Sequence, residues 1–308
     1  MLDTKVIQQY NSLEFVVNQL VEGFMTGLHK SPFHGFSVEF AEHRVYNPGE
    51  SVKNIDWKLY GRTDKLFVKR FEEETNLRCY LLIDNSSSMH YPVVAEPSIK
   101  TPDKITFSVY AAACITQLLQ QQRDAVGLSV FSEDIDLFTP IRSSIDHQKF
   151  LFAEYEKLIN SFSISEKKKS NVAASLHLIA EKIHKRSLIV IFSDMFDTEA
   201  NIDDMFNAIQ HLKYNKNEVI LFHVVDKDKE INLDFPDKPI KFIDLESNTE
   251  LKINPKILRE DYSELLSKRK EEIELRCLQY QIDFVEVDIN QGYNSIMLNF
   301  LKKRQKLH

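Results

Sequence analysis

The chain has 308 residues, of which 43% are hydrophobic, so it can bury a sizeable core in one large domain or two. Its formal net charge is −7, which argues against sequence-independent binding of nucleic acid, because that binding needs clustered Lys and Arg. The three cysteines lie far apart and form no CxxC pair, which favours reduced thiols over a disulfide scaffold.

The N-terminal stretch and the apolar runs of the chain indicate where in the cell the protein is expected. The N-terminal stretch MLDTKVIQQYNSLEF lacks the basic and hydrophobic regions of a signal peptide. The longest apolar runs, such as SLIVIF, are far too short to span a bilayer. We therefore expect a cytoplasmic protein without a membrane span.

The first 75 residues are predicted to form a separate N-terminal α+β module. A helix is expected from about Thr4 to Val21. Extended pieces follow at Phe36–Phe40 and Lys65–Phe71, separated by turns at NPGE and YGRTD. This module is predicted to end at residue 75.

From residue 76 to 308 the pattern alternates between strands and helices. Strands are predicted at CYLLID, AVGLSVF, IDLFTPI, SLIVIFSD, EVILFHVVD and IDFVEVD. Helices are predicted at 104–122, 147–161, 172–185, 202–212, 256–281 and 295–304, and a hairpin insertion near 239–255. Continuous apolar strands separated by helices indicate an α/β fold with a doubly wound, mostly parallel sheet that is covered on both faces.

Polar side chains follow two of these strands. CYLLID ends in Asp84 and LIVIFSD ends in Asp194, while Ser86 and Ser88 follow Asp84 at alternate positions. Ser170 stands just before the helix that begins near residue 172. Since the carboxyl ends of parallel strands meet at one edge, we expect these groups to converge there.

Two carboxylates and three hydroxyls form an all-oxygen donor set. Such donors suit Mg²⁺, with Mn²⁺ or Ca²⁺ as alternatives, and no imidazole or thiolate is present to favour zinc. Waters and one replaceable ligand would complete the shell, and a carboxylate of another protein could fill that position. The alternative is a serine-rich loop in which Asp84 and Ser86 only cap the following turn.

The DxSxS pattern at Asp84, Ser86 and Ser88 resembles the metal-ion-dependent adhesion site (MIDAS) of von Willebrand factor A domains. That resemblance implies a von Willebrand factor A-like fold and metal ligation by these three residues. Ser170 stands where the family usually places a Thr, and Asp194 matches the Asp after a central strand. Lysines replace the glycines that often precede the Thr. The expected partner-binding residues are Asn85, Ser87 and Lys169, which stand next to these donors in the sequence.

The N-terminal segment resembles the segment that precedes the A-like domain in domain of unknown function 58 proteins. The pieces that carry the likeness are Gly27-Leu28-His29, Arg44-Val45-Tyr46-Asn47-Pro48-Gly49-Glu50, Ile55-Asp56-Trp57 and Arg62-Thr63. The resemblance covers nearly the whole chain. It implies a MoxR-type AAA+ ATPase as partner and a role in assembling or activating other proteins.

The prediction is thus a metal-dependent protein-interaction module that is not an enzyme. One alternative is a scaffold protein that needs no metal. A second is a Mg²⁺-dependent phosphoester hydrolase with Asp84 as nucleophile, although Ser86 stands where such a site would have a second acid. The chain has no G-x-S-x-G elbow and no G-x-x-x-x-G-K-[ST] loop, which excludes a serine hydrolase of that type and a P-loop ATPase.

Overall fold

The computed structural model describes residues 12–30, 43–45, 57–63, 65–69, 77–160, 172–195, 202–243 and 250–306. The chain divides into two compact units, Met1–Gly23 with Leu77–His308, and Phe24–Asn76. The boundary at residue 76 lies next to the predicted one, but the first half of the N-terminal helix groups with the larger unit.

The smaller unit contains a short antiparallel strand pair. Its described elements are β1 (His43–Val45), α3 (Trp57–Thr63) and β2 (Phe67–Lys69), and Arg44 lies opposite Val68. The predicted turn at YGRTD is wrong, because α3 continues through Thr63. The predicted strand at 36–40 and the NPGE turn lie outside the described residues.

The helix α2 (Leu13–Lys30) belongs to both units and runs on past the predicted end at residue 21. Residues 4–11 of the predicted helix lie outside the described part. Leu13, Val17 and Val21 are buried at helical spacing. The Leu13 N–H donates to Glu156 at 3.3 Å, which ties the start of α2 to the larger unit.

A six-stranded sheet forms the centre of the larger unit, in the order β10-β7-β6-β3-β4-β5. Its strands are β3 (Arg78–Asp84), β4 (Ala125–Phe131), β5 (Ile135–Phe138), β6 (Leu188–Ser193), β7 (Glu218–Val225) and β10 (Asp283–Asp288). All neighbours are parallel except β5, which is antiparallel to β4. The central strands are almost wholly buried apolar runs because helices cover both of their faces.

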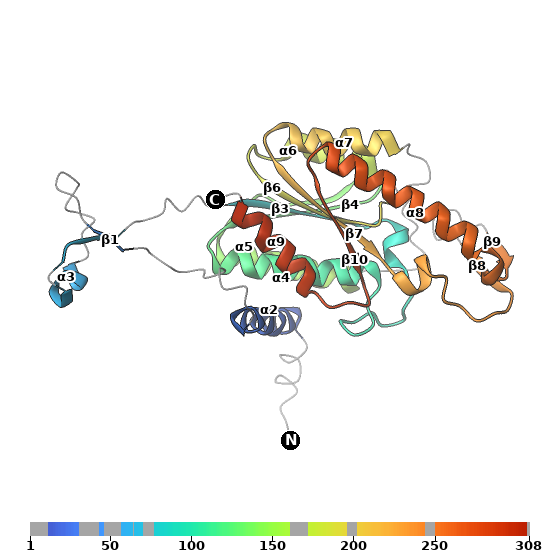
Figure 1. Ribbon diagram of the computed structural model, residues 1–308, viewed down its shortest axis with the longest axis horizontal. Coiled ribbons are helices and arrows are strands. Elements are labelled where there is room, and N and C mark those ends of the chain that lie inside the picture. The colour runs from blue at the N-terminus through green and yellow to red at the C-terminus, as the bar shows by residue number, and fades with distance from the viewer. Residues whose placement is uncertain are drawn as a thin grey trace, which may run out of the picture. The chain divides into compact units, whose positions relative to one another are not determined.

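Helices cover both faces of the sheet in two layers (Figure 1). One layer contains α4 (Lys104–Gln121), α5 (Ile145–Asn160) and α9 (Asn294–Lys306). The other contains α6 (Val172–Lys182), α7 (Ile202–Tyr214) and α8 (Pro255–Gln279). The predicted α/β fold with a doubly wound, mostly parallel sheet and helices on both faces is therefore confirmed.

Shorter elements complete the larger unit. A 3-10 turn, η2 (Ser87–His90), follows β3, and a single π-helical turn, η3 (Lys227–Ile231), follows β7. The strands β8 (Ile240–Ile243) and β9 (Glu250–Ile253) form an antiparallel pair where the hairpin is predicted. No helix in the described ranges is long and apolar enough to cross a membrane.

Candidate functional site at the carboxyl edge of β3 and β6

The strands β3 and β6 lie side by side at the point where the direction of the chain through the sheet reverses. From β3 the chain continues to β4 on one side and later returns to β6 on the other. Their parallel register pairs Ile83 with Phe192, so Asp84 ends level with Ser193 and Asp194 follows directly. Both acids therefore lie at one edge, at the topological switch point where doubly wound sheets bind ligands.

Asp84 is the last residue of β3 and is fully buried. Its Oδ1 accepts a hydrogen bond from the Ser86 N–H at 2.9 Å, and its Oδ2 accepts one from the Ser193 hydroxyl at 2.6 Å. Its pKa is raised to about 6, first because burial disfavours the charged form and second because Asp194 is negative. The hydrogen bonds from Ser193 and Ser86 oppose that rise.

The loop after Asp84 brings its serines together. The hydroxyls of Ser86 and Ser88 lie 3.1 Å apart, with Ser86 buried and Ser88 partly exposed. With the Asp84 carboxylate they place three oxygen-bearing side chains in one short loop. The predicted oxygen donors of the DxSxS pattern, Asp84, Ser86 and Ser88, are thus close to one another.

Asn85, which lies between Asp84 and Ser86, makes hydrogen bonds that hold this loop in place. The Asn85 amide nitrogen donates to Asp136 at 3.1 Å, and its amide oxygen lies 3.2 Å from Nε2 of His90. Asn85 and Ser87 are only 8% and 7% exposed, respectively. These two predicted partner-binding residues therefore offer little surface to another protein in this structure.

Asp194 follows β6 and is 6% exposed. Its Oδ2 pairs with the Lys104 ammonium at 2.7 Å, and the same ammonium lies 2.5 Å from Oε1 of Glu230. Burial lowers the pKa of Lys104, but the two carboxylates raise it more, so the net shift is upward and the side chain is a cation. One ammonium is thus held between two acids at the edge of the sheet.

His223, on β7, supports Asp194 from the neighbouring strand. Its Nε2 lies 3.0 Å from the backbone oxygen of Asp194. Burial lowers the pKa of His223 to about 4, so the imidazole is neutral near pH 7. His223 therefore adds no positive charge to the site, whereas the Lys104 ammonium pairs directly with Asp194.

The residues present match a magnesium site in their chemistry. Asp84, Ser86, Ser88 and Asp194 offer hard oxygen donors, and the raised pKa of Asp84 marks a carboxylate that a nearby cation would stabilise. Ser170 and Lys169 lie outside the described residues. Across the described ranges, no three His, Cys, Asp or Glu side chains are grouped to hold a metal.

Three residues of the site were not predicted as site residues. Lys104 is the one charged residue of the largely buried helix α4, and a single charge in such a position is a signal that sequence reasoning could have used. Ser193 precedes Asp194 within the strand motif. Glu230 comes five residues beyond β7 in η3, and the sequence gives no local sign that this turn would bring it to Lys104.

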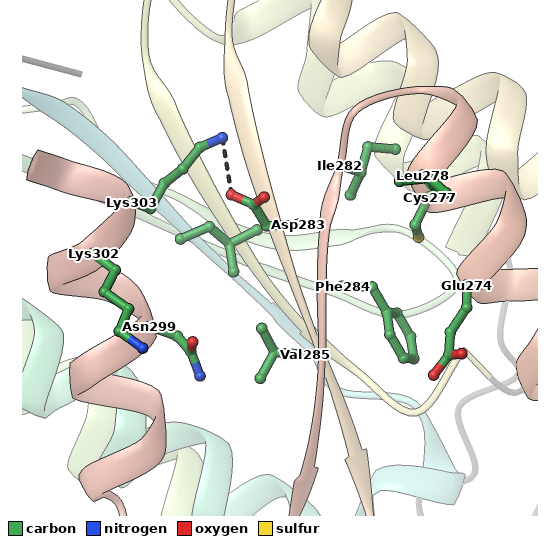
Figure 2. A pocket seen from close by; sticks show the side chains of 11 residues that line it. Glu274, Cys277, Leu278, Ile282, Asp283, Phe284, Val285, Asn299, Lys302 and Lys303 are labelled. Atoms are coloured by element: carbon green, nitrogen blue, oxygen red, sulfur yellow. Dashed lines mark ion pairs between the residues drawn. The ribbon is translucent and has the colours of Figure 1, made fainter. Parts of the chain in front are cut away.

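A cavity of about 490 Å³ lies elsewhere, along the edge strand β10 between α8 and α9 (Figure 2). Leu278, Ile282 and Phe284 supply apolar lining, and the Lys303–Asp283 ion pair of 2.9 Å lies beside them. Asp283 begins β10, which is parallel to its neighbour β7. This cavity is therefore near the amino ends of the strands, away from Asp84 and Asp194.

The family model described as "Protein of unknown function DUF58" matches residues 42–272, which is more than half of the chain. The chain belongs to the DUF58 family. The match includes β3, β6 and β7, so the DUF58 region contains the whole described part of the site.

Curated relatives of this DUF58 protein are found in mycobacteria. Uncharacterized protein Mb1516 of Mycobacterium bovis is 24% identical over 192 residues, which cover 62% of this chain and 58% of the relative. Uncharacterized protein Rv1480 of Mycobacterium tuberculosis matches with the same identity and coverage. The DUF58 protein thus spans less than two thirds of the length of these relatives.

Solved structures with a similar arrangement include BatB from Bacteroides thetaiotaomicron, with a TM-score of 0.44, 14% identity and coverage of 75% of this chain and 98% of that one. The VWA domain of SpRpn10 has a TM-score of 0.40 and 10% identity, and covers 73% and 94%. At these scores the matches add nothing to the family assignment.

Proposed function

We propose that this DUF58 protein is a protein-interaction module in which a divalent cation bridges the chain and its partner. Asp84, Ser86, Ser88 and Asp194, together with Ser170, would hold Mg²⁺, with Mn²⁺ or Ca²⁺ as alternatives. The observation that carries the proposal is the position of Asp84 and Asp194 at one edge, on the two strands that flank the switch point. Bound there, the ion would supply a Lewis-acidic contact point for an oxygen ligand.

The electrostatics support a cation at this edge. Asp84 is fully buried, and the nearby charge of Asp194 adds to the rise of its pKa. Two acids in one buried place are stabilised when an added positive charge screens their repulsion. Mg²⁺ also keeps several waters and takes few protein ligands, so one position can accept a carboxylate from outside.

The arrangement of the serines supports a role in binding rather than in catalysis. Nucleophilic catalysis needs a base within hydrogen-bond reach of the nucleophile. In the part of the chain that the structure describes, the Ser86 and Ser88 hydroxyls bond to each other and neither is paired with an imidazole. Ser86 also occupies the position where a phosphatase with an Asp84 nucleophile would carry its second acid. We therefore propose a non-catalytic module.

The partner proposed is a protein that offers an acidic side chain to the ion. The family resemblance favours a MoxR-type AAA+ ATPase, and the shared work would be the assembly or activation of other proteins in the cytoplasm. Co-purification of the full chain with such an ATPase, in Mg²⁺ and again in EDTA, tests this part. Retention that is equal in both buffers would contradict an ion-bridged contact.

Calorimetric titration with Mg²⁺ tests the metal site itself. The wild type is expected to bind, whereas Asp84→Ala removes a central ligand and should abolish binding. Asp204→Ala, which removes an exposed acid on α7, is the matched control and should bind like the wild type. Absence of binding to the wild type, or equal binding to wild type and Asp84→Ala, would contradict the site.

A metal-independent scaffold is the second candidate, and one observation favours it. The Lys104 ammonium already neutralises part of the negative charge at Asp194. In that case partner binding would persist in EDTA. The phosphoester hydrolase alternative predicts turnover of phosphoester substrates that Asp84→Ala abolishes, and the proposed module predicts none.

A further inference from the structure

The position of Lys104 is unfavourable for a charged ammonium for two reasons. It is only 2% exposed, so its ammonium has lost most of its hydration. It is also the first residue of α4, after the N-cap Asp103, and the N-terminal end of a helix carries partial positive charge. A lysine is retained there only if strong contacts offset both costs.

Those contacts come from the segments that follow two strands. The Lys104 ammonium lies 2.7 Å from Asp194, after β6, and 2.5 Å from Glu230, after β7. Glu230 is itself held, because its other carboxylate oxygen accepts the Asp226 N–H at 2.9 Å. The ring of Tyr91 lies 5.9 Å from the ammonium and adds a weaker cation–π contact.

The two acids differ in what else they can do. Asp194 is a proposed metal ligand, whereas Glu230 belongs to the π-helical turn η3 and contacts Lys104 from that separate segment. An ammonium with two acidic partners can give up one and keep the other. Glu230 therefore provides a place for Lys104 when Asp194 turns to another cation.

We propose that Lys104 is the resident cation of the site and competes with a divalent ion for Asp194. The proposal rests on the proposed metal-binding function. Without metal, the ammonium holds Asp194. When a divalent ion enters, Asp194 exchanges the ammonium for the ion and Lys104 stays with Glu230. The lysine thus weakens metal binding by the natural chain and makes it responsive to metal concentration.

Two substitutions test this competition. Lys104→Met keeps much of the buried volume and removes the charge. The double variant Lys104→Met/Glu230→Gln removes one positive and one negative charge, so it keeps the net charge and reduces the risk that the protein fails to fold. Circular dichroism establishes which variant is folded. If Lys104→Met does not fold, the double variant is used to test the competition.

The measurement is calorimetric titration with Mg²⁺, supported by thermal unfolding with Mg²⁺ or EDTA. Both variants are expected to bind Mg²⁺ at least about tenfold more tightly than the wild type, a difference of about 1.4 kcal/mol. Mg²⁺ should also raise their unfolding temperature more than it raises that of the wild type. Adding Asp84→Asn to Lys104→Met should remove the gain, because the ion then lacks a ligand.

The outcomes separate this inference from the proposed function. Equal or weaker binding by the variants, with binding by the wild type, would overturn the competition and leave the metal site standing. Binding by the variants alone would support Lys104 as the resident cation and reject metal dependence of the natural chain. Absence of binding in all proteins would reject both proposals.

Discussion

The Ser193 hydroxyl donates a hydrogen bond of 2.6 Å to Oδ2 of Asp84, and this bond joins the ends of β6 and β3 at the switch point of the sheet. The same hydroxyl accepts the Met195 N–H at 2.9 Å. Ser193 therefore orients the Asp84 carboxylate and also shapes the backbone that carries Asp194. It is a positioning residue for both acids.

Ser193→Ala should destabilise the protein and shift the titration of Asp84. The loss of a buried hydrogen bond to a charged group typically costs about 1–3 kcal/mol. Because the Ser193 bond lowers the pKa of Asp84, its removal should raise that pKa further above about 6. Denaturant unfolding measures the first effect, and carboxyl-carbon NMR of the metal-free protein measures the second.

Ser129→Ala is the matched control for this change. The Ser129 hydroxyl is also buried and donates to the Leu137 backbone oxygen at 3.0 Å, between β4 and β5. Its loss should cost about 1 kcal/mol and leave the titration of Asp84 unchanged. An unaltered Asp84 pKa in Ser193→Ala would contradict the positioning role.

Asp84 should make the metal-free protein less stable as the pH rises. Its pKa in the folded state, about 6, lies above its ordinary value of 3.8. Its contribution is therefore fully present below the ordinary pKa and is lost as the pH rises through about 6. A rise of about two in pKa corresponds to about 3 kcal/mol. Asp84→Asn cannot ionise, so its stability relative to the wild type should increase by about that amount between pH 4 and 7.

Unfolding free energies measured in EDTA across this range test the prediction. The quantity to compare is the difference in unfolding free energy between the wild type and Asp84→Asn, because the titration of His223 changes the stability of each protein with pH in the opposite direction. With its pKa lowered to about 4, His223 contributes stability above its ordinary pKa that is lost as the pH falls. That contribution is common to both proteins. A difference that stays flat from pH 4 to 7 would show that Asp84 is not perturbed.

The sequence was a good guide to the sheet. Strands such as CYLLID and LIVIFS are continuous apolar runs, so their burial on both faces and their strand ends followed from composition alone. The secondary-structure predictions that are wrong lie in segments where tertiary packing overrides the local sequence preference. The YGRTD segment contains a glycine, which favours a turn, yet its first four residues form part of α3. The end of the N-terminal helix is also predicted wrongly, because α2 runs past Val21 to Lys30.

Only the site residues that follow the strands could be predicted from the sequence. Asp84 and Asp194 could be placed at one edge, because parallel strands end together. The partners of Asp194 could not be placed. Lys104 arrives through a helix start, and Glu230 arrives through the π-helical turn η3, whose path depends on local geometry rather than on periodicity.

Arg304 is expected to contribute more to stability than its neighbour Lys302. The Arg304 guanidinium pairs with the buried Asp124 at 2.8 Å, whose other oxygen accepts the Leu77 N–H at 3.0 Å. Arg304→Ala should therefore cost about 1–3 kcal/mol, because the buried Asp124 carboxylate loses a charged hydrogen-bond partner. Lys302→Ala removes an exposed charge on the same helix and should stay within about 0.5 kcal/mol of the wild type. Equal effects in denaturant unfolding would contradict this internal role for the basic C-terminal helix.

A crystal of the full chain grown with Mn²⁺, measured at a wavelength where manganese scatters anomalously, tests the metal site most directly. We expect an anomalous peak in bonding contact with the Asp84 carboxylate and the Ser86 and Ser88 hydroxyls, with Lys104 withdrawn from Asp194 toward Glu230. A map without a peak at this edge, with the Lys104–Asp194 pair intact at high Mn²⁺ concentration, would contradict this expectation.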